Sequence, residues 1–333
     1  MFRSLSPHTR ATLTALFVTF LWATSWVIIK FGLRDNIPPL TFAGTRYTLA
    51  ALCLLPLVLG QSSLRAPLRT LSRRQWMMLA ALGLVFIGVA QGAQFVSLNY
   101  LPAVTVNLLL SFTTIVVTAL GIFFLRERPL RVQWLGLALY LVGALVYFYP
   151  ASLSGNEVFG ILAALVCLTA NAVGAILGRA INRMATIPPI TVTLISMGIG
   201  GTALLAVGII LEPTPTFSLI SILSILWLSV VNTAFAFTIW NRALRTLTAI
   251  EANIINSMML VFIPGLAWLF LGETITLKAL LALALATGGI FVVTLARWEN
   301  PLASVRAFTQ RKRSSYAEQA ILNPTQDTDS TVD

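Results

Sequence analysis

Ile37-Pro-Pro-Leu-Thr41 recurs 150 residues later as Ile187-Pro-Pro-Ile-Thr191. Further identities follow at an offset of 146 residues and end with Gly143, which matches Gly289. The intervening matches pair Leu101 with Leu247, Ala103 with Ala249, Asn107 with Asn253, Phe124 with Phe270, Leu125 with Leu271 and Glu127 with Glu273. Self-similarity at a fixed spacing indicates a chain built from two related halves. In an apolar membrane protein, such halves are typical of transporters with a central site.

The composition is that of a membrane protein. Hydrophobic residues make up 57% of the 333 residues, charged residues only 10%, and the mean hydropathy is +0.87. A soluble domain carries roughly 25% charged residues, whereas a bilayer core about 30 Å thick is crossed by roughly 20 apolar helical residues. The sequence therefore predicts an all-α integral membrane protein with ten transmembrane helices, arranged as two inverted five-helix repeats. The expected spans are Ala11–Ile29, Leu40–Leu59, Trp76–Val96, Ala103–Phe124, Val132–Phe148, Val158–Leu177, Ile190–Leu211, Leu219–Ile239, Ile254–Leu271 and Leu277–Ala296.

The predicted domain organisation follows from these spans. Residues 1–10 form a cytoplasmic N-terminal segment, residues 11–149 the first repeat and residues 157–296 the second. Residues 297–333 are polar, and we expect a disordered cytoplasmic tail. The first apolar segment lacks a small-x-small cleavage site and is therefore expected to be a helix of the mature protein. The only cysteines, Cys53 and Cys167, fall inside spans, so neither a disulfide framework nor a metal site is predicted.

The basic residues set the orientation. With the N-terminus in the cytoplasm, all but four of the 22 Lys and Arg residues lie in cytoplasmic segments; the exceptions are Lys30, Arg34, Lys278 and the intramembrane Arg46. Cytoplasmic loops are enriched in Lys and Arg, so both termini are predicted to be cytoplasmic. The pI of about 10.6 follows from this pattern, and it does not indicate a nucleic-acid partner.

The charges also test the inversion of the second repeat. Because five spans are an odd number, the second copy must enter the membrane in the opposite direction. Arg126 and Arg128 match the uncharged Gly272 and Thr274, whereas Val96 and Asn99 match Arg242 and Arg245. The basic residue is thus always in the copy that faces the cytoplasm, as the positive-inside rule requires.

Several short motifs carry a family resemblance. They are Leu-Trp-Ala-Thr-Ser (21–25) with Lys30, Phe-Ala-Gly-Thr-Arg (42–46), Leu-Asn-Tyr-Leu-Pro-Ala (98–103), Leu-Arg-Glu-Arg (125–128) and Leu-Gly-Glu-Thr (271–274). In this order and spacing, the chain resembles the EamA-type ten-span members of the drug/metabolite transporter superfamily from about Ala11 to Ala296. Two departures stand out. The fourth span lacks the proline that the family often has, since Thr118 stands at the position that matches Pro264 of the ninth span, and Asn171 takes the place of Trp22 in the second copy.

The resemblance implies a fold and an activity. It implies two inverted bundles with a substrate cavity between them, alternating access, and export of small metabolites such as amino acids, nucleobases or amines. It implies no cofactor and no ATP, and the sequence contains no Walker A motif. The implied partners are a small-molecule metabolite and the lipid bilayer, and the implied location is the inner membrane of a bacterium.

Polar and aromatic side chains within spans are the candidate site. Polar groups inside a membrane are expensive and usually face the bundle interior, and amides offer both donors and an acceptor to a substrate. Alternatively, an Asn or Gln bonds a neighbouring helix, which contributes about 1 kcal/mol; we favour this for Asn107 and Asn253 and favour the cavity for Asn171 and Asn232. The candidate substrate-binding residues are Trp22, Arg46, Gln91, Gln94, Asn171, Asn232 and Trp240.

Arg46 is the one charge well inside a span, about 9 Å deep at 1.5 Å per residue. No Asp or Glu lies at the same depth, so a substrate carboxylate is one possible partner; the alternative is that the side chain snorkels to the surface or caps backbone carbonyls. Trp22, Trp26, Tyr47, Phe95 and Trp240 provide aromatic walls for an apolar or cationic group or pack in the core.

The scarcity of intramembrane acids and the presence of a single His, His8, bear on mechanism. They argue against an enzyme and against proton coupling through a mid-membrane carboxylate. Facilitated diffusion, exchange, or coupling by the substrate's own charge are left. A channel-like pore and a drug or amine efflux protein are the alternatives to a metabolite exporter, whereas a receptor or scaffold has no use for an inverted repeat.

Overall fold

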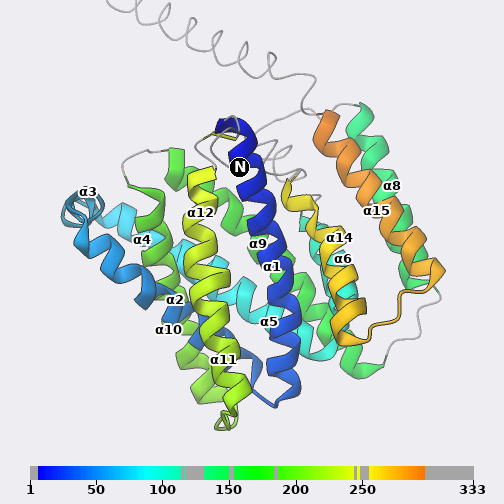
Figure 1. The fold of residues 1–333 in the computed structure, drawn as a ribbon, viewed down its shortest axis with the longest axis horizontal. Coiled ribbons are helices and arrows are strands. Elements are labelled where there is room, and N and C mark those ends of the chain that lie inside the picture. Colours follow the sequence, from blue (N-terminus) through cyan, green and yellow to red (C-terminus); the bar gives the residue numbers. More distant parts are fainter. Residues whose placement is uncertain are drawn as a thin grey trace, which may run out of the picture.

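The computed structural model describes residues 7–113, 116, 131–149, 154–183, 187–243, 246–247 and 255–296. Within these residues all regular structure is helical (Figure 1). The predicted tail (297–333), the first Leu-x-Glu copy (125–128) and Asn253 lie outside the described residues.

The helices match most of the predicted spans. In chain order they are α1 (Pro7–Arg34), α2 (Pro39–Gly60), α3 (Ser62–Arg65), η2 (Ala66–Arg69), α4 (Arg73–Leu82), η3 (Gly83–Gln91), α5 (Gly92–Tyr100), α6 (Ala103–Ser111), α8 (Arg131–Phe148), α9 (Gly155–Arg183), α10 (Pro189–Leu211), α11 (Leu219–Trp227), η4 (Leu228–Phe235), α12 (Ala236–Ala243), α14 (Met259–Leu266), η5 (Ala267–Leu271) and α15 (Leu277–Ala296).

Six helical stretches are long and apolar enough to cross a membrane. They are Pro7–Arg34, Pro39–Gly60, Arg73–Tyr100, Gly155–Gly178, Pro189–Leu211 and Leu219–Trp240. Trp134–Phe148, Ile255–Leu271 and Leu277–Val292 are shorter apolar helices. The predicted span Ala103–Phe124 is described as a helix only as far as Ser111. An all-helical protein with several membrane-crossing helices is therefore confirmed.

Local sequence explains where the helices begin. Proline stands at the first position of both α2 and α10, where its missing N–H costs no hydrogen bond. Ser72 and Gln75 form a capping box at α4, and Ser218 accepts a hydrogen bond from the Ser221 backbone N–H at α11.

Three helices change to π-helical geometry inside the membrane segments. η3 lies between α4 and α5, η4 between α11 and α12, and η5 follows α14. π-helical turns are rare and are frequently found at functional sites because they leave backbone groups outside the regular hydrogen-bond ladder. In η4 the Thr233 hydroxyl donates to the Leu228 carbonyl (2.8 Å), five residues earlier.

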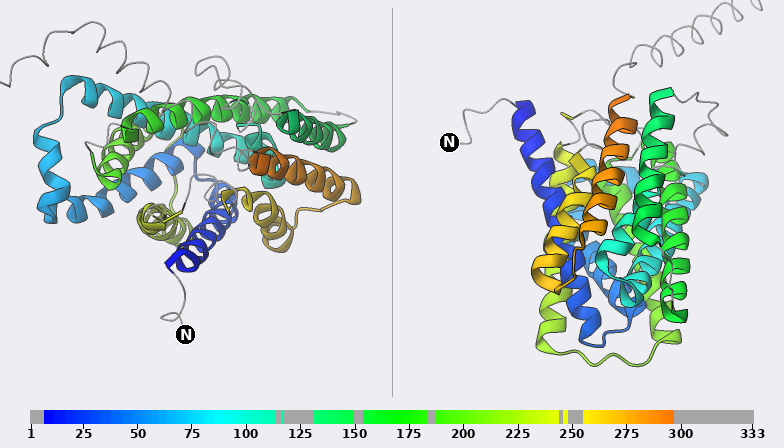
Figure 2. Two further views of the ribbon diagram at one scale, coloured as in Figure 1. Left: turned by 90° about the horizontal axis from the view of Figure 1, so that it is seen from above. Right: turned by 90° about the vertical axis from the view of Figure 1, so that its right-hand side faces the viewer.

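Two long helix pairs join distant parts of the chain, and glycines let their backbones approach closely. α2 packs along α10: a Cβ on Gly44 would lie 2.4 Å from Leu205 Cα, and one on Gly201 would lie 2.8 Å from Thr48 N. α8 packs along α15, where the closely approaching glycines are Gly143 and Gly289 (Figures 1 and 2). Small residues at helix interfaces are the usual device for tight packing in membranes.

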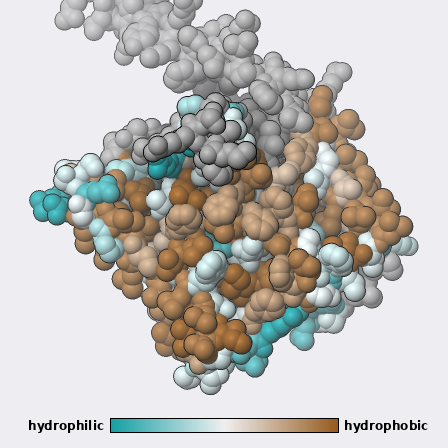
Figure 3. Space-filling model, in the orientation of Figure 1, coloured by the Kyte–Doolittle hydropathy of each residue, from teal (hydrophilic) through white to brown (hydrophobic). Residues whose placement is uncertain are grey.

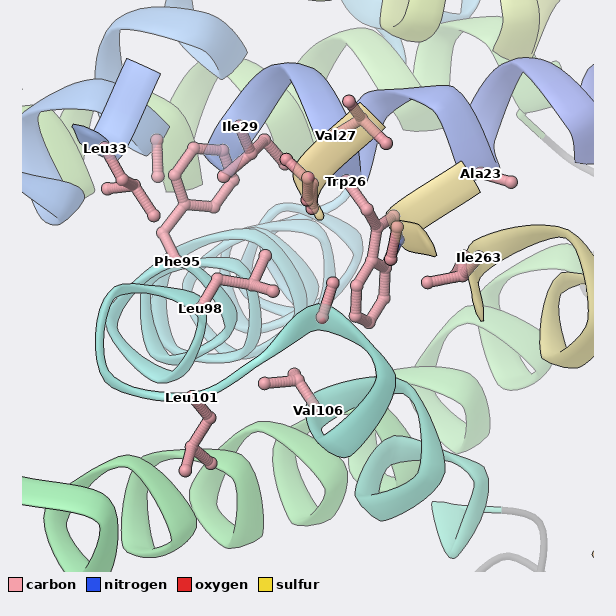
Figure 4. Packing of buried hydrophobic residues seen from close by; sticks show 14 of the residues in the cluster. Ala23, Trp26, Val27, Ile29, Leu33, Phe95, Leu98, Leu101, Val106 and Ile263 are labelled. Atoms are coloured by element: carbon pink, nitrogen blue, oxygen red, sulfur yellow. The ribbon is translucent and has the colours of Figure 1, made fainter. Parts of the chain in front are cut away.

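The largest buried cluster lies where α1 meets α5, α6 and α14 (Figure 4). Trp26, Ile29 and Leu33 of α1 point toward Phe95 and Leu98 of α5 in this view. This packing surrounds the C-terminal half of α1 with apolar side chains.

The outer surface of the bundle is apolar. Leu145 and Ile210, for example, expose 70% and 77% of their area. Figure 3 shows hydrophobic residues over most of the visible face, and hydrophilic ones gather near α3 and along the lower edge. Contiguous apolar surface of this extent is the surface that a lipid bilayer covers.

We call the end opposite the N-terminus the distal end; it carries the connections 35–38, 101–102, 212–218 and 272–276. Gly272 adopts a left-handed conformation (φ 68°) that ends η5. The next residue, Glu273, turns toward α6, and its carboxylate accepts hydrogen bonds from the backbone N–H groups of Ala103 (2.7 Å) and Val104 (3.1 Å). The ammonium of Lys30 donates to the carbonyls of Leu98 and Leu101, both at 2.7 Å. Charged side chains thus cap exposed helix ends here.

Candidate functional site

A first polar contact joins α1 to η4. The Trp22 indole Nε1–H donates to the Asn232 backbone carbonyl (3.1 Å), and the Asn232 amide Nδ2 donates to the Leu21 carbonyl and to Thr24 Oγ1 (3.2 Å). Asn232 is completely buried, and its Oδ1 has no hydrogen-bond partner among the described residues. A buried acceptor without a donor is costly in a bundle interior, and a donor on a bound molecule would satisfy it.

A second contact joins α2 to the next residue of η4. Arg46 exposes only 5% of its area, so the snorkelling alternative does not describe this side chain. Its Nε–H donates to Thr233 Oγ1 (3.0 Å), and its Cζ lies 5.1 Å from the Tyr47 ring centroid and 5.9 Å from that of Phe95. Within the described part of the chain no carboxylate pairs with this guanidinium. The site therefore keeps positive charge that an anionic group would neutralise.

Tyr47 extends this network to η3. Its hydroxyl donates to Gln91 Oε1 at 2.6 Å, so α2 is bonded to the π-helical segments η3 and η4. Gln94, one turn further along α5, is partly buried. Gln91 is thus linked to Arg46 through Tyr47. Gln94 is one helical turn from Gln91, and we describe no contact between it and this network.

Aromatic rings flank the α1–η4 contact on the side away from the distal end. The Trp22 ring centroid lies 5.0 Å from that of Trp240 and 5.1 Å from that of Phe237. All three side chains are partly rather than fully buried. They form an aromatic wall beside the polar contacts.

We define the polar cluster as Trp22, Thr24, Arg46, Asn232 and Thr233. Of the predicted site residues, the structure brings Trp22, Arg46 and Asn232 into this cluster. Trp240 contacts Trp22 directly, and Gln91 is bonded to Tyr47 beside Arg46. Thr24, Thr233 and Phe237 were not predicted. Threonine in an apolar helix is common and usually bonds its own backbone, so the one usable signal was the position of Thr233 beside Asn232.

Asn171 and Asn107 lie elsewhere. The Asn171 amide donates to Cys167 Sγ (3.3 Å), one turn earlier on α9, and the side chain is partly buried. Asn107 donates to the Met259 carbonyl of α14 (3.3 Å), as expected for an amide that bonds a neighbouring helix. The substrate-binding role of Asn171 stays a prediction, and its described hydrogen-bond partner lies on its own helix.

The chemistry available to the polar cluster is binding. It holds a guanidinium, an amide, two hydroxyls and an indole N–H, and it has no carboxylate, imidazole or thiolate that could act as an acid, base or nucleophile. No group of three potential metal ligands occurs among the residues that the structure describes.

Comparison with known proteins identifies the family. The model of the EamA-like transporter family matches residues 9–149 and matches again over residues 158–295. The chain belongs to the EamA-like transporter family. It is a membrane transporter, and its long apolar helices suit a location in a membrane.

Individual relatives of this EamA-like chain bear names of the same kind. The uncharacterized transporter YoaV of Bacillus subtilis (strain 168) is 28% identical over 286 residues, which cover 83% of this chain and 94% of the relative. A "probable amino-acid metabolite efflux pump" of Salmonella typhimurium is 26% identical over 289 residues, 84% of this chain and 92% of the relative. The inner membrane transporter YedA of Escherichia coli (strain K12) is 26% identical over 324 residues, 92% of this chain and 96% of the relative.

The fold also occurs among solved structures. One crystal structure superposes with a TM-score of 0.60 at 20% identity and covers 86% of this chain and 99% of the other. The helical architecture is thus shared with an experimentally determined protein.

Proposed function

We propose that this transporter exports a small metabolite bearing a carboxylate, by alternating access between two inverted five-helix repeats (residues 11–149 and 157–296). The proposal includes ten spans, cytoplasmic termini and an outward-facing distal end. The cargo class agrees with the name of the Salmonella relative, an amino-acid metabolite efflux pump.

Reciprocal contacts support the inverted repeat. A Cβ on Gly143 would meet the Ala282 carbonyl (2.7 Å), and a Cβ on Gly289 would meet the Gly136 carbonyl (2.5 Å). The two pairs exchange under the 146-residue offset, because 136 maps to 282 and 143 maps to 289. η3 and η4 also overlap under this offset. Reciprocity of this kind is expected when a pseudo-twofold axis relates two repeats.

The observation that carries the substrate class is Arg46. The Arg46 guanidinium is 5% exposed and has one hydroxyl partner and two aromatic neighbours. Among the described residues it lacks the negative charge that normally accompanies a buried cation. Its planar fork of donors suits a carboxylate. Asn232 lies next to Thr233, and its Oδ1, which has no partner in the described part of the chain, would accept a hydrogen bond from a substrate N–H group.

Counterflow in liposomes tests this function. Vesicles are loaded with an unlabelled pool of amino acids and related acids, and uptake of labelled members is followed for the wild type, Arg46→Gln and Arg69→Gln. Arg69 is an exposed arginine of η2 and serves as the matched control. We expect saturable, counter-substrate-stimulated uptake that only Arg46→Gln abolishes; uptake that neither saturates nor responds to counter-substrate would indicate a channel-like pore.

A drug or amine efflux protein is the second candidate, and the aromatic wall of Trp22, Phe237 and Trp240 favours it. The same vesicles separate the two. Organic cations would be carried as well or better by Arg46→Gln, because the variant removes a repelling charge, whereas transport of acids would be lost.

A further inference from the structure

Polar contacts join the two halves of the chain at the distal end. Glu212, after α10, accepts the backbone N–H groups of Leu40 (2.8 Å) and Thr41 (2.7 Å) at the start of α2. Arg34 Nη2 donates to the Leu271 carbonyl (3.0 Å), and both Ser218 Oγ and Ser221 Oγ donate to Asp35 Oδ2. With the Glu273–α6 contact, these bonds are the polar links between the two halves that we describe at this end.

The contacts differ in how readily they can break. At the Glu212 contact the backbones themselves are close, since a Cβ on Gly208 would lie 2.6 Å from Thr41 N. This pairing continues along the whole of α2 and α10, so separating the two helices there would also open a tightly packed interface. We expect them to stay together during a transport cycle.

The Asp35 contact is made by side chains alone. Asp35 lies just beyond α1 and is partly exposed, so water can replace both serine hydroxyls as its hydrogen-bond donors. Ser218 would still cap α11 through its bond from the Ser221 N–H (3.1 Å). The contact can therefore open without unwinding either helix.

The helices joined at Asp35 also carry the residues of the polar cluster other than Arg46, which lies on α2. α1 packs beside α11, η4 and α12 in turn. Thr24 precedes Asp35 by eleven residues, about 16 Å along α1 at 1.5 Å per residue, and Asn232 likewise follows Ser221 by eleven residues. The Asp35–Ser221 and Thr24–Asn232 contacts thus join the same two antiparallel helical segments at two levels. The Asp35–Ser221 contact lies between the polar cluster and the distal surface.

We propose that Asp35, Ser218 and Ser221 form the distal gate of the transport path. In the present conformation the gate is closed. Breaking its hydrogen bonds lets the end of α1 separate from α11, while α2 and α10 stay paired, and opens the polar cluster toward the distal side. This assignment rests on the transport function proposed above.

Cysteine accessibility tests the gate without a substrate. In a background that carries Cys53→Ser and Cys167→Ser, Thr24→Cys reports on the polar cluster and Thr214→Cys, in the exposed α10–α11 connection, shows which vesicle face presents the distal end. A membrane-impermeant thiol reagent is applied to that face. We expect Asp35→Ala and Ser221→Ala each to accelerate labelling of Thr24→Cys by about threefold or more, because a hydrogen bond to a charged group is lost from the closed state only.

Ser154→Ala is the matched control. Ser154 is also a serine at a helix start that donates to a carboxylate, Glu157 Oε2 (3.0 Å), but this bond stays within one element. Labelling in this variant should equal that in the background; an equal rise in Ser154→Ala and Ser221→Ala would overturn the gate, because it would indicate general loosening.

Unchanged labelling in folded Asp35→Ala and Ser221→Ala would also overturn the proposal. If Asp35→Ala does not fold, Ser221→Ala, which removes one hydroxyl, decides alone. A protein that carries no metabolite in the counterflow assay would still give a labelling result, so failure of the transport function and failure of the gate are separate outcomes.

Discussion

Replacing Arg46 by Met should weaken binding of a carboxylate while leaving the stability of the fold nearly unchanged. Met replaces the apolar stem of Arg by an unbranched, flexible side chain and removes the charge. Thr233 is not left without a partner, because its hydroxyl still donates to the Leu228 carbonyl. The variant therefore separates a binding role for Arg46 from a structural one.

The magnitude follows from the contacts of the guanidinium. Its hydrogen bond to Thr233 contributes about 1.5–3 kcal/mol, and its positions over Tyr47 and Phe95 contribute about 1 kcal/mol each. Burying the charge costs several kcal/mol, which offsets this total. We expect the free energy of unfolding to change by no more than about 1 kcal/mol, and affinity for a carboxylate to fall by about 10- to 100-fold through loss of a charge-assisted contact.

Thermal unfolding in detergent, with and without a transported acid, measures both quantities. The acid should raise the melting temperature of the wild type and of the control Arg69→Met, because a ligand stabilises the state that binds it, and should leave Arg46→Met unaffected. A loss of about 3–5 kcal/mol, the usual effect of breaking a buried ion pair, together with undiminished ligand stabilisation, would refute the binding role.

Three further predictions concern packing, pH and the α1–η4 contact. Gly44→Ala should destabilise the fold by about 1–3 kcal/mol, because its methyl group would lie 2.4 Å from the α10 backbone. Gly265→Ala, whose methyl group would meet nothing within 4 Å beyond its own stretch of helix, should be neutral or stabilising in the same unfolding assay. Hydrogen bonds from two serine hydroxyls lower the pKa of Asp35, so its contribution to stability should be complete above the ordinary value of about 3.9 and be lost as pH falls through the lower folded value. Melting temperatures between pH 7 and pH 3 should show the onset of this loss in the wild type, and an equal loss in Asp35→Asn would contradict it. Trp22→Phe should reduce stability by about 0.5–1.5 kcal/mol, since the Nε1–H donor to Asn232 is removed and the ring is kept; no loss in a chemical unfolding titration would show that water replaces this bond.

Helix positions were predictable from the sequence because long apolar runs end at prolines and basic clusters. α15 has the predicted bounds Leu277–Ala296, and α2 begins one residue before its predicted start. The π-helical segments were not predictable. In Gly83–Ala90 every residue is apolar or glycine, so the sequence has no polar face from which the residues per turn could be read.

For the candidate site, the sequence predicts which residue types line it, but only some of the contacts between them. Burying a charged or amide side chain in a membrane costs free energy, so Arg46 and Asn232 stand out from the sequence alone. Their partners are 187 and 208–211 residues away, and no local pattern encodes such contacts. Asn171 resembled Asn232 in sequence, yet its described partner is Cys167 at i−4, a spacing at which helical side chains always meet.

The pairing of α2 with α10 and of α8 with α15 has a consequence for biogenesis. A ribosome delivers α2 to the membrane about 150 residues before α10, so the closest partner of the Gly44 face does not yet exist when α2 is inserted. The first half must therefore wait in the bilayer as loosely associated helices, and the step that commits the protein to its native state is the docking of one half on the other. Residues 1–149 expressed alone should be cleared by membrane proteases, whereas co-expression with residues 150–333 as a separate chain should rescue them.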